Sequence, residues 1–411
     1  VWVAEGVYPA SPSGDNDESV MLTEGLRLYG GFLGTETSLS QRDVEAHPTV
    51  IDGELGDPAV PDDNSCRAVV LAEDSRLDGF TVQNGSGIIG CASSVDGVGV
   101  VAEGVNARVE SCIIKQNGGT WGVAAMRVAG NSHVHIHDTV FEANSVHQGT
   151  LLVADTAQVD LMGSVFRMNG ALIATAIRLR AQAVLRAVGC SFEDNVSPTA
   201  FATVLFDDQA NGSFTNCVFL RNQAQVGAVN DSGASVSFIN CLVAGNEGSS
   251  IGGILAGGSE STVLQSTTVA ANTGDLTGGL WVTSTLVVVR DSILWGNTSN
   301  AATVAESQLL QAQNAYPMVL FSTVEGGSVF PGQGNGNSDP LFINTDPANG
   351  PLDLHLSTGS PCIDSGSDAL ILPDESDLDG DGNVSEPTPF DLDGAARVVG
   401  AAVDMGAYES Q

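Results

Sequence analysis

The sequence predicts an all-β fold, a single-stranded right-handed parallel β-helix with about three short strands in each coil. Two observations predict it: a hexapeptide that recurs with a period of about 26 residues, and an alternation of inward and outward side chains within each copy. A helical solenoid is disfavoured because no 3.6-residue period persists. A leucine-rich repeat is disfavoured because its Leu-x-x-Leu-x-Leu frame is missing.

The recurring hexapeptide ends in asparagine. Its copies end at Asn117, Asn144, Asn169, Asn195, Asn222, Asn246, Asn272 and Asn297, and Gly79–Asn84 is an earlier copy. In each copy a small residue and a large apolar residue alternate, as Thr139 and Phe141 do, so both face one side of a strand. Asparagine tolerates the left-handed backbone conformation, and its amide bonds backbone groups. We therefore expect each Asn to close a strand at a turn, and the eight side chains to stack in one column.

Further positions complete the coil. Polar residues or glycines mark a bend before each copy, at Asp138, Gly163, Gly189, Asn216 and Asn240. A third strand follows the Asn, and Trp281 is expected to pack inside it. The residue four before each Asn is apolar and should point outward, at Ile113, Val140, Val165, Val218, Leu242 and Ile293. An exposed apolar stripe of this kind is a partner surface or a seat for another segment of the chain. The seat is the favoured interpretation, with the Pro/Gly-rich residues from about 300 to 411 as its cover.

The chain is predicted to be one solenoid in three sections: an entry coil and loop over residues 1–60, regular coils over 61–300, and final coils with a tail over 301–411. It opens at Val1-Trp2-Val3 without an initiator Met, so we interpret it as a processed or excised fragment whose leader and first cap are missing. No apolar run approaches the roughly 20 residues of a membrane helix.

The composition is strongly acidic. Among 411 residues, 49 Asp and Glu face 14 Lys and Arg, for a formal charge of −35. Such a surface repels nucleic acids and anionic membranes and favours divalent cations. It also disfavours an anionic polysaccharide unless a metal bridges the charges.

Seven cysteines are an odd number, so at least one is unpaired within the chain. Cys66 and Cys91 flank the first repeat copy and are the candidate disulfide, which an exported protein permits. Cys190, Cys217 and Cys241 occupy the small inward position and are expected to be stacked, buried thiols.

The repeat resembles the parallel β-helix proteins of the pectin-lyase-like superfamily. The flanking segments are similar to those of bacterial choice-of-anchor or polymorphic-outer-membrane-protein-like surface proteins. The segments that carry this resemblance are Val1–Tyr8, Leu28–Thr37, Pro48–Gly53, Asp339–Phe342, Gly359–Asp364 and Val403–Glu409. The resemblance implies export and surface display. It implies no reaction, because a fold does not fix a function.

The segment Asp377-Leu-Asp379-Gly-Asp381-Gly-Asn383 resembles the first half of a calcium loop, with carboxylates at alternate positions followed by glycine. Thr388 stands where a bidentate Glu is expected, and Glu386 comes two residues early. Asp391 and Asp393 could supply the missing ligands. We predict a structural calcium ion here, and an acidic solvated loop is the alternative.

Three histidines, His133, His135 and His137, alternate on one predicted strand and share its outward face. Asp160 occupies the position equivalent to His135 in the next coil. Histidine and carboxylate side chains are ligands of transition metals, so a metal site is one interpretation. Exposed strand residues are the preferred interpretation, because three histidines of one strand do not easily converge on one ion.

Catalytic candidates are weak. Aligning the coils gathers acidic residues and one arginine near one turn row, at Asp155, Arg180, Asp207, Asp208 and Asp231. Charged turns are the preferred interpretation of this row on so acidic a chain. Trp121 and Trp295 are the aromatic side chains most suited to an exposed sugar platform.

The sequence thus favours a non-catalytic extracellular or cell-surface module for adhesion, spacing or binding. A carbohydrate or another surface protein is the expected partner, with no nucleic acid and no membrane insertion by this segment. The alternative is a polysaccharide lyase or glycoside hydrolase that acts in a groove on the β-helix.

Overall fold

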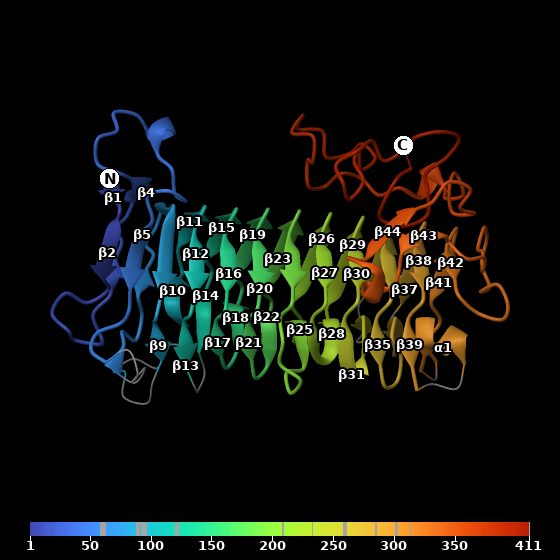
Figure 1. The fold of residues 1–411 in the computed structure, drawn as a ribbon, viewed down its shortest axis with the longest axis horizontal. Coiled ribbons are helices and arrows are strands. Elements are labelled where there is room, and N and C mark those ends of the chain that lie inside the picture. The colour runs from blue at the N-terminus through green and yellow to red at the C-terminus, as the bar shows by residue number, and fades with distance from the viewer. Residues whose placement is uncertain are drawn as a thin grey trace. The chain divides into compact units, whose positions relative to one another are not determined.

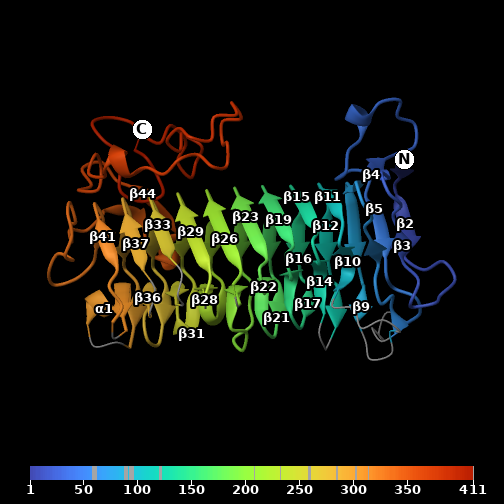
Figure 2. The same cartoon turned by 180° about the vertical axis from the view of Figure 1, so that it is seen from behind.

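The computed structural model has the predicted fold, a right-handed parallel β-helix (Figures 1 and 2). It describes residues 1–57, 63–87, 91, 97–119, 123–207, 209–231, 233–257, 261–283, 286–300, 303–312 and 314–410. The chain divides into two compact units. The N-terminal unit comprises Val1–Arg186 and Ser191–Ala210, and the C-terminal unit comprises Ala187–Cys190 and Asn211–Gln411. The section boundaries expected near residues 60 and 300 remain a prediction.

Each coil of the N-terminal unit contributes one strand to each of three parallel sheets. Sheet A contains β1 (Trp2–Ala4), β4 (Arg27–Phe32), β7 (Ser75–Asp78), β11 (Asn106–Glu110), β15 (His133–His137), β19 (Gln158–Met162) and β23 (Val184–Val188). Sheet B contains β2 (Gly6–Pro9), β5 (Thr49–Asp52), β8 (Phe80–Gln83), β12 (Ile113–Lys115), β16 (Val140–Glu142), β20 (Val165–Arg167) and β24 (Ser191–Glu193). Sheet C contains β3 (Val20–Met21), β6 (Val69–Val70), β10 (Gly97–Glu103), β14 (Ala124–Ala129), β18 (Gly149–Val153), β22 (Ala174–Leu179) and β25 (Ala202–Phe206).

Short elements complete this unit. A small sheet between sheets B and C contains β9 (Ser86–Gly87), β13 (Gly118–Gly119), β17 (Ser145–Val146) and β21 (Gly170–Ala171). A 3₁₀ turn, η1 (Leu39–Gln41), lies in the loop between β4 and β5.

The C-terminal unit repeats the three-sheet plan. Its sheet A contains β26 (Asn211–Thr215), β29 (Ser235–Ile239), β33 (Thr262–Gln265), β37 (Val287–Arg290) and β41 (Met318–Leu320). Its sheet B contains β27 (Val218–Leu220), β30 (Leu242–Ala244), β34 (Thr268–Ala270), β38 (Ile293–Trp295) and β42 (Thr323–Val324). Its sheet C contains β28 (Gln223–Asp231), β31 (Glu247–Ile251), β32 (Ile254–Ala256), β35 (Thr273–Gly274), β36 (Leu280–Val282), β39 (Thr298–Ser299) and β40 (Leu309–Gln311).

The last part of the chain adds a short helix, α1 (Val304–Gln308), and irregular chain. After β42, the only sheet among the described residues is an antiparallel pair, β43 (Phe342–Asn344) and β44 (Asp353–Leu356). The 3₁₀ turns η3 (Pro347–Asn349) and η4 (Asp368–Leu370) interrupt the loops.

The core follows from the alternation in the sequence. In β15, Val134 and Ile136 are fully buried. His133, His135 and His137 alternate with them and face outward. The phenylalanines three before Asn144, Asn169 and Asn195 stack from coil to coil, with ring centroids 4.3 Å apart for Phe141 and Phe166 and 5.3 Å apart for Phe166 and Phe192. Trp281 differs from the prediction: it lies half-buried between buried Leu280 and Val282, so the alternation turns it outward.

The predicted asparagines form buried ladders. In the N-terminal unit the Nδ2 of each Asn donates to the Oδ1 of the next, at 3.1 Å from Asn117 to Asn144 and 3.0 Å from Asn144 to Asn169 and from Asn169 to Asn195. In the C-terminal unit the ladder runs through Asn222, Asn246, Asn272 and Asn297 at 2.9–3.0 Å. It ends on Gln308 of α1, whose Oε1 accepts from Asn297 at 2.7 Å.

The left-handed residue of each turn stands one position before the Asn. Ala143, Met168 and Ala271 have φ of 52°, 54° and 55°, and glycines occupy the equivalent positions 245 and 296. The expectation that Asn itself takes this conformation was therefore wrong. The Asn turns its amide inward instead, where it satisfies backbone groups of adjacent coils.

The earliest repeat copy is shifted by one residue from the predicted alignment. Val82 pairs with Ile114 and Gln83 with Lys115, so Asn84 corresponds to Gln116. Gly85 takes the ladder position, and its N–H donates to Oδ1 of Asn117 at 3.0 Å. The backbone N–H of Asn117 makes the same bond to Asn144, so Gly85 keeps the backbone donor of this position and lacks the side-chain amide.

The expected cover lies on sheet B of the C-terminal unit. Leu242 is buried beneath Leu354, Phe342, Leu352, Leu392 and Tyr408, and Ile293 is buried beneath Cys362 and Met405. The bend residues Asn216 and Asn240 donate to the carbonyls of Asp391 and Phe390 at 2.7 and 2.6 Å. In the N-terminal unit Ile113 of the same stripe remains exposed.

Cys66 and Cys91, the pair predicted from the sequence, are joined by a disulfide with Cα atoms 5.9 Å apart. The five other cysteines lie outside this disulfide and are buried: Cys112, Cys190, Cys217, Cys241 and Cys362. Burial raises the pKa of the Cys112 thiol to about 12. Burial also raises the pKa of the Cys217 and Cys362 thiols. Cys112, Cys217 and Cys362 are therefore packing groups whose thiols stay protonated at neutral pH.

Candidate functional site

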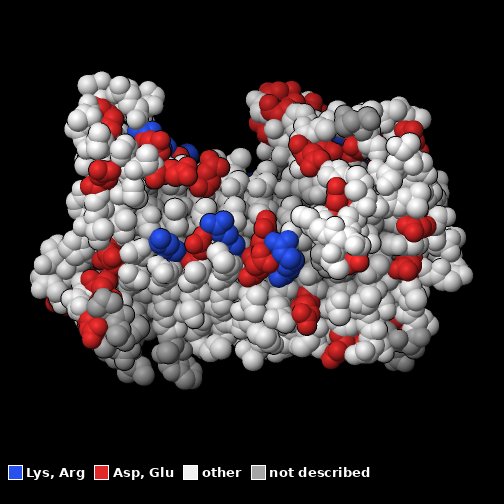
Figure 3. Space-filling view, viewed as in Figure 1, with Lys and Arg blue, Asp and Glu red and all other residues white. Residues whose placement is uncertain are grey.

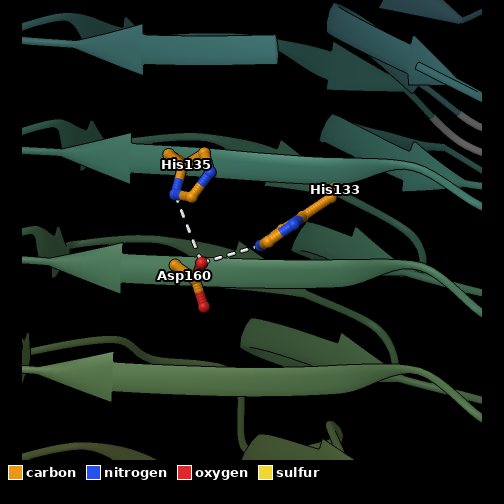
Figure 4. A group of neighbouring side chains, drawn as sticks. All are labelled: His133, His135 and Asp160. Carbon is orange, nitrogen blue, oxygen red and sulfur yellow. Dashed lines mark hydrogen bonds and ion pairs between the residues drawn. The ribbon is translucent and has the colours of Figure 1, made fainter. Parts of the chain in front are cut away.

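Two histidines and one aspartate converge on the outer face of sheet A in the N-terminal unit (Figure 4). His133 and His135 project from β15, and Asp160 projects from β19, where it pairs in register with His135. Asp160 Oδ2 lies 2.7 Å from His133 Nε2 and 3.2 Å from His135 Nδ1. The third histidine, His137, is outside the cluster, so the strand brings two histidines together rather than three.

Arginines continue the register row that contains His135 and Asp160. Arg27 of β4, Arg76 of β7 and Arg108 of β11 occupy it in successive coils. A hollow of about 360 Å³ opens over these arginines, with His135 at its edge. Burial lowers the pKa of His135, and the positive groups around it, His133 and Arg108 among them, add to the effect against the opposing charge of Asp160. Sequence reasoning missed this hollow because β4 lies outside the regular repeat.

The arginines of the row differ in their ion pairs. Arg76 is half-buried and bonds Asp78 and Glu110, and hydrogen bonds to Asp78 raise its pKa against the effect of burial. The side chains of Arg27 and Arg108 are 61% and 52% exposed, and their carboxylate partners lie 3.9 and 3.8 Å away. Two guanidinium groups therefore remain accessible on a chain that has few of them.

The predicted calcium loop brings its three aspartates together in the C-terminal unit. Carboxylate oxygens of Asp377, Asp379 and Asp381 lie within 4.8 Å of one another. Asp379 also belongs to a second group of the same dimension, with Asp374 and Glu386. Asp374 was missed because it precedes the alternating pattern, although it is the most buried residue of the five.

The two added carboxylates carry oxygens without a partner. Asp374 Oδ1 and Glu386 Oε1 are shielded from solvent and accept no hydrogen bond. Burial raises the pKa of both groups, and the neighbouring Asp379 raises both further. Carboxylate oxygens in this number and proximity are the ligands that calcium takes, and a divalent cation would relieve their repulsion.

Asn383, Asp391 and Asp393, which the sequence analysis connected with this loop, form hydrogen bonds with other groups. Asn383 donates from Nδ2 to Glu386 at 3.1 Å, and its Oδ1 accepts from Ser385. Asp391 accepts from the backbone of Ala395 and Glu409, and Asp393 bonds His355 at 2.7 Å. Asp391 and Asp393 therefore do not complete the loop, and Asn383 positions one of its carboxylates.

The carboxylates of the predicted turn row have separate partners. Asp207 bonds the guanidinium of Arg178 at 2.8 Å, and Asp155 accepts from the N–H of Gly130. Asp231 is 1% exposed and closes a turn, accepting from the N–H of Ala234 and from Thr262 Oγ1. Burial raises the pKa of Asp231. Arg180 follows β22, and its backbone N–H donates to the carbonyl of Val153. Asp208 is outside the described residues.

A second hollow, of about 540 Å³, lies within the chain after β42. His355 lines it and bonds Asp353 and Asp393 at 2.6 and 2.7 Å. Glu409 also lines it, and burial raises its pKa to about 7. These groups connect segments that are distant in the sequence, so their contacts are explained by a structural role.

Charged groups alternate on sheet B of the N-terminal unit. Lys115, Glu142, Arg167 and Glu193 face outward in successive coils and stand in register. Figure 3 shows red and blue atoms alternating across this face. Of the predicted sugar platforms, Trp295 is half-buried and Trp121 lies outside the described residues.

No family model matches the chain, and no curated protein matches it. Among solved structures it is similar to the crystal structure of pectate lyase Pel9A, with a TM-score of 0.46 and 10% identity over 97% of this chain and 98% of that chain. A likeness of this degree carries no argument about activity. The resemblance to choice-of-anchor or polymorphic-outer-membrane-protein-like proteins stays a prediction. Among the described residues no helix is long and apolar enough to cross a membrane.

Proposed function

We propose that this chain is a non-catalytic extracellular or cell-surface module, a β-helical scaffold for adhesion, spacing or binding that calcium fastens near its C-terminal end. The acidic loop carries the proposal. Five carboxylates of residues 374–386 crowd together, and two of them hold shielded oxygens without a hydrogen-bond partner. A loop of this kind suits calcium at the high concentrations found outside cells, where weak sites of about 10⁻⁴–10⁻³ M are filled.

Two further observations support the proposal. The disulfide between Cys66 and Cys91 is typical of an oxidising compartment. The turn-row carboxylates Asp155, Asp207 and Asp231 are each engaged by a backbone or side-chain partner, as expected of groups that shape turns. A carbohydrate or another surface protein is the proposed partner of the module.

Calorimetric titration with calcium tests the metal part of the proposal. We expect binding at submillimolar to millimolar calcium and a thermal midpoint that chelator lowers. Asp379→Asn should weaken binding at least tenfold, since Asp379 belongs to both ligand groups. Glu375→Gln removes the same charge from an exposed neighbour and should change affinity less than about threefold. Equal losses in the two variants, or no binding at all, would contradict the calcium site.

Incubation with calcium and a panel of neutral and acidic polysaccharides tests the non-catalytic part. We expect no release of reducing ends and no unsaturated products. Asp207→Ala, Asp208→Ala and Asp231→Ala are the informative variants, because these carboxylates belong to the weak catalytic candidates. Turnover by the wild type that any of these variants abolishes would replace this proposal with the lyase or hydrolase alternative.

A further inference from the structure

We propose that His133, His135 and Asp160 form a binding site for a divalent transition metal of the zinc class, with a coordination position left open to a solvent molecule or a small anion. Two imidazoles and one carboxylate are a common protein ligand set of open zinc sites. Among the described residues, this is the only group of three potential ligands that contains histidine. The site lies in the N-terminal unit, and the acidic loop lies in the C-terminal unit.

The distances between the ligand atoms suit a single ion. Asp160 Oδ2 lies 2.7 and 3.2 Å from the two imidazole nitrogens, and all three atoms fall within 4.8 Å. Metal–ligand bonds of about 2.0–2.2 Å in a tetrahedral site place ligand atoms roughly 3.4 Å apart. Side-chain adjustments of about an ångström would therefore exchange the two hydrogen bonds for metal–ligand bonds.

The strands hold these side chains in place before any ion binds. Val134 and Ile136 fix β15 from the inside, and Val159 and Leu161 fix β19 in the same way, all with 1% exposure or less. Parallel pairing sets His135 opposite Asp160. A site built on rigid strands loses little backbone entropy when the metal binds.

The surroundings leave room for a ligand from solution. The side chains of His133, His135 and Asp160 are 38%, 33% and 23% exposed. His135 borders the arginine-lined hollow, and Arg108 stands in register beside it. Guanidinium groups next to an incompletely ligated cation favour an anion, such as a carboxylate or phosphate group, at the open position.

Cobalt absorption spectroscopy tests the site on the whole chain, with calcium present in excess to occupy the acidic loop. We expect visible bands of tetrahedral or five-coordinate cobalt that zinc abolishes by displacement. Azide should shift these bands because a position is open. His133→Gln, His135→Gln and Asp160→Asn should each weaken zinc binding at least tenfold. His137→Gln, on the same face of β15 but outside the cluster, should stay within threefold of the wild type.

Circular dichroism and the thermal midpoint of each metal-free variant check that it is folded, and three separate ligand variants keep the test independent of any one of them. No zinc binding below millimolar concentration would overturn the site. So would an equal loss in His137→Gln, or wild-type affinity in all three ligand variants, because binding would then belong to the surface at large. Cobalt bands unchanged by azide would overturn the open position.

Discussion

At the scale of single residues, the asparagine ladder explains why Asn recurs in each coil and why the residue before it has a left-handed backbone conformation. Oδ1 of Asn144 accepts from the backbone and side chain of Asn117, and its Nδ2 donates to Asn169 and to the carbonyl of Ile114. The preceding residue must then take a left-handed conformation, which costs about 1–2 kcal/mol for a residue with a Cβ. Sequence periodicity located the ladder. It did not locate the strained residue, because Ala143 or Met168 has no local preference for that conformation.

Asn144→Ala tests the ladder. The alanine leaves an N–H of Asn117 and the carbonyl of Ile114 without buried partners, so we expect the free energy of unfolding to fall by about 2–4 kcal/mol. Urea denaturation measures it. Asn131→Ala changes an exposed asparagine in a nearby turn and should cost less than about 0.5 kcal/mol. Similar losses of unfolding free energy in the two variants would show that the buried amide of the ladder contributes no more to stability than an exposed one.

At the scale of elements, the segment after β42 is held by contacts that its own sequence does not reveal. It has little regular structure, yet its apolar side chains cover Leu242 and Ile293. The sequence marked the apolar stripe as a seat and Asn240 as a bend, but not that this bend residue donates to the carbonyl of Phe390. The acidic loop is similar: the antiparallel bridge between Pro373 and Pro387 brings its two ends together. Such long-range pairings leave no local pattern in a sequence.

This segment should loosen as the pH rises. Burial raises the pKa of Glu409 to about 7, and hydrogen bonds with Asp393 and Asp353 raise the pKa of His355 in spite of its partial burial. Both folded-state pKa values lie above the unfolded ones. The stabilisation is therefore complete below the unfolded values, about 4.3 for Glu and 6.5 for His, and is lost as the pH rises through the folded ones.

Hydrogen exchange of residues 339–410, corrected for the intrinsic rate at each pH and measured without calcium, should show protection that falls from pH 5 to pH 8.5. His355→Gln should remove the part of this dependence above pH 6.5, whereas His137→Gln, in the other unit, should preserve it. Protection that rises with pH, or a profile that His355→Gln leaves unchanged, would contradict the assignment of this pH dependence to Glu409 and His355.

At the scale of the whole molecule, the sequence predicted the strand register of the coils better than the side-chain geometry of the candidate sites. Periodicity places His135 opposite Asp160, and parallel pairing makes them neighbours. The rotamers that direct His133 Nε2 to the same carboxylate are set by packing in three dimensions. The arginine-lined hollow joins Arg27, Arg76 and Arg108, which lie 49 and 32 residues apart in the sequence. Counting along regular coils cannot find a site whose first residue lies in an irregular one.

The net charge of −35 predicts that salt stabilises the fold. Raising sodium chloride from about 10 to 150 mM shortens the Debye length from about 30 to 8 Å and screens repulsion between carboxylates. Ion pairs such as Arg76 with Glu110 weaken in salt, but 14 basic residues cannot balance 49 acidic ones. With chelator present, the thermal midpoint at pH 7 should therefore rise with salt. Near pH 4 many carboxylates are protonated, and the rise should be smaller. A midpoint that falls with salt at pH 7 would mean that the ion pairs outweigh the repulsion.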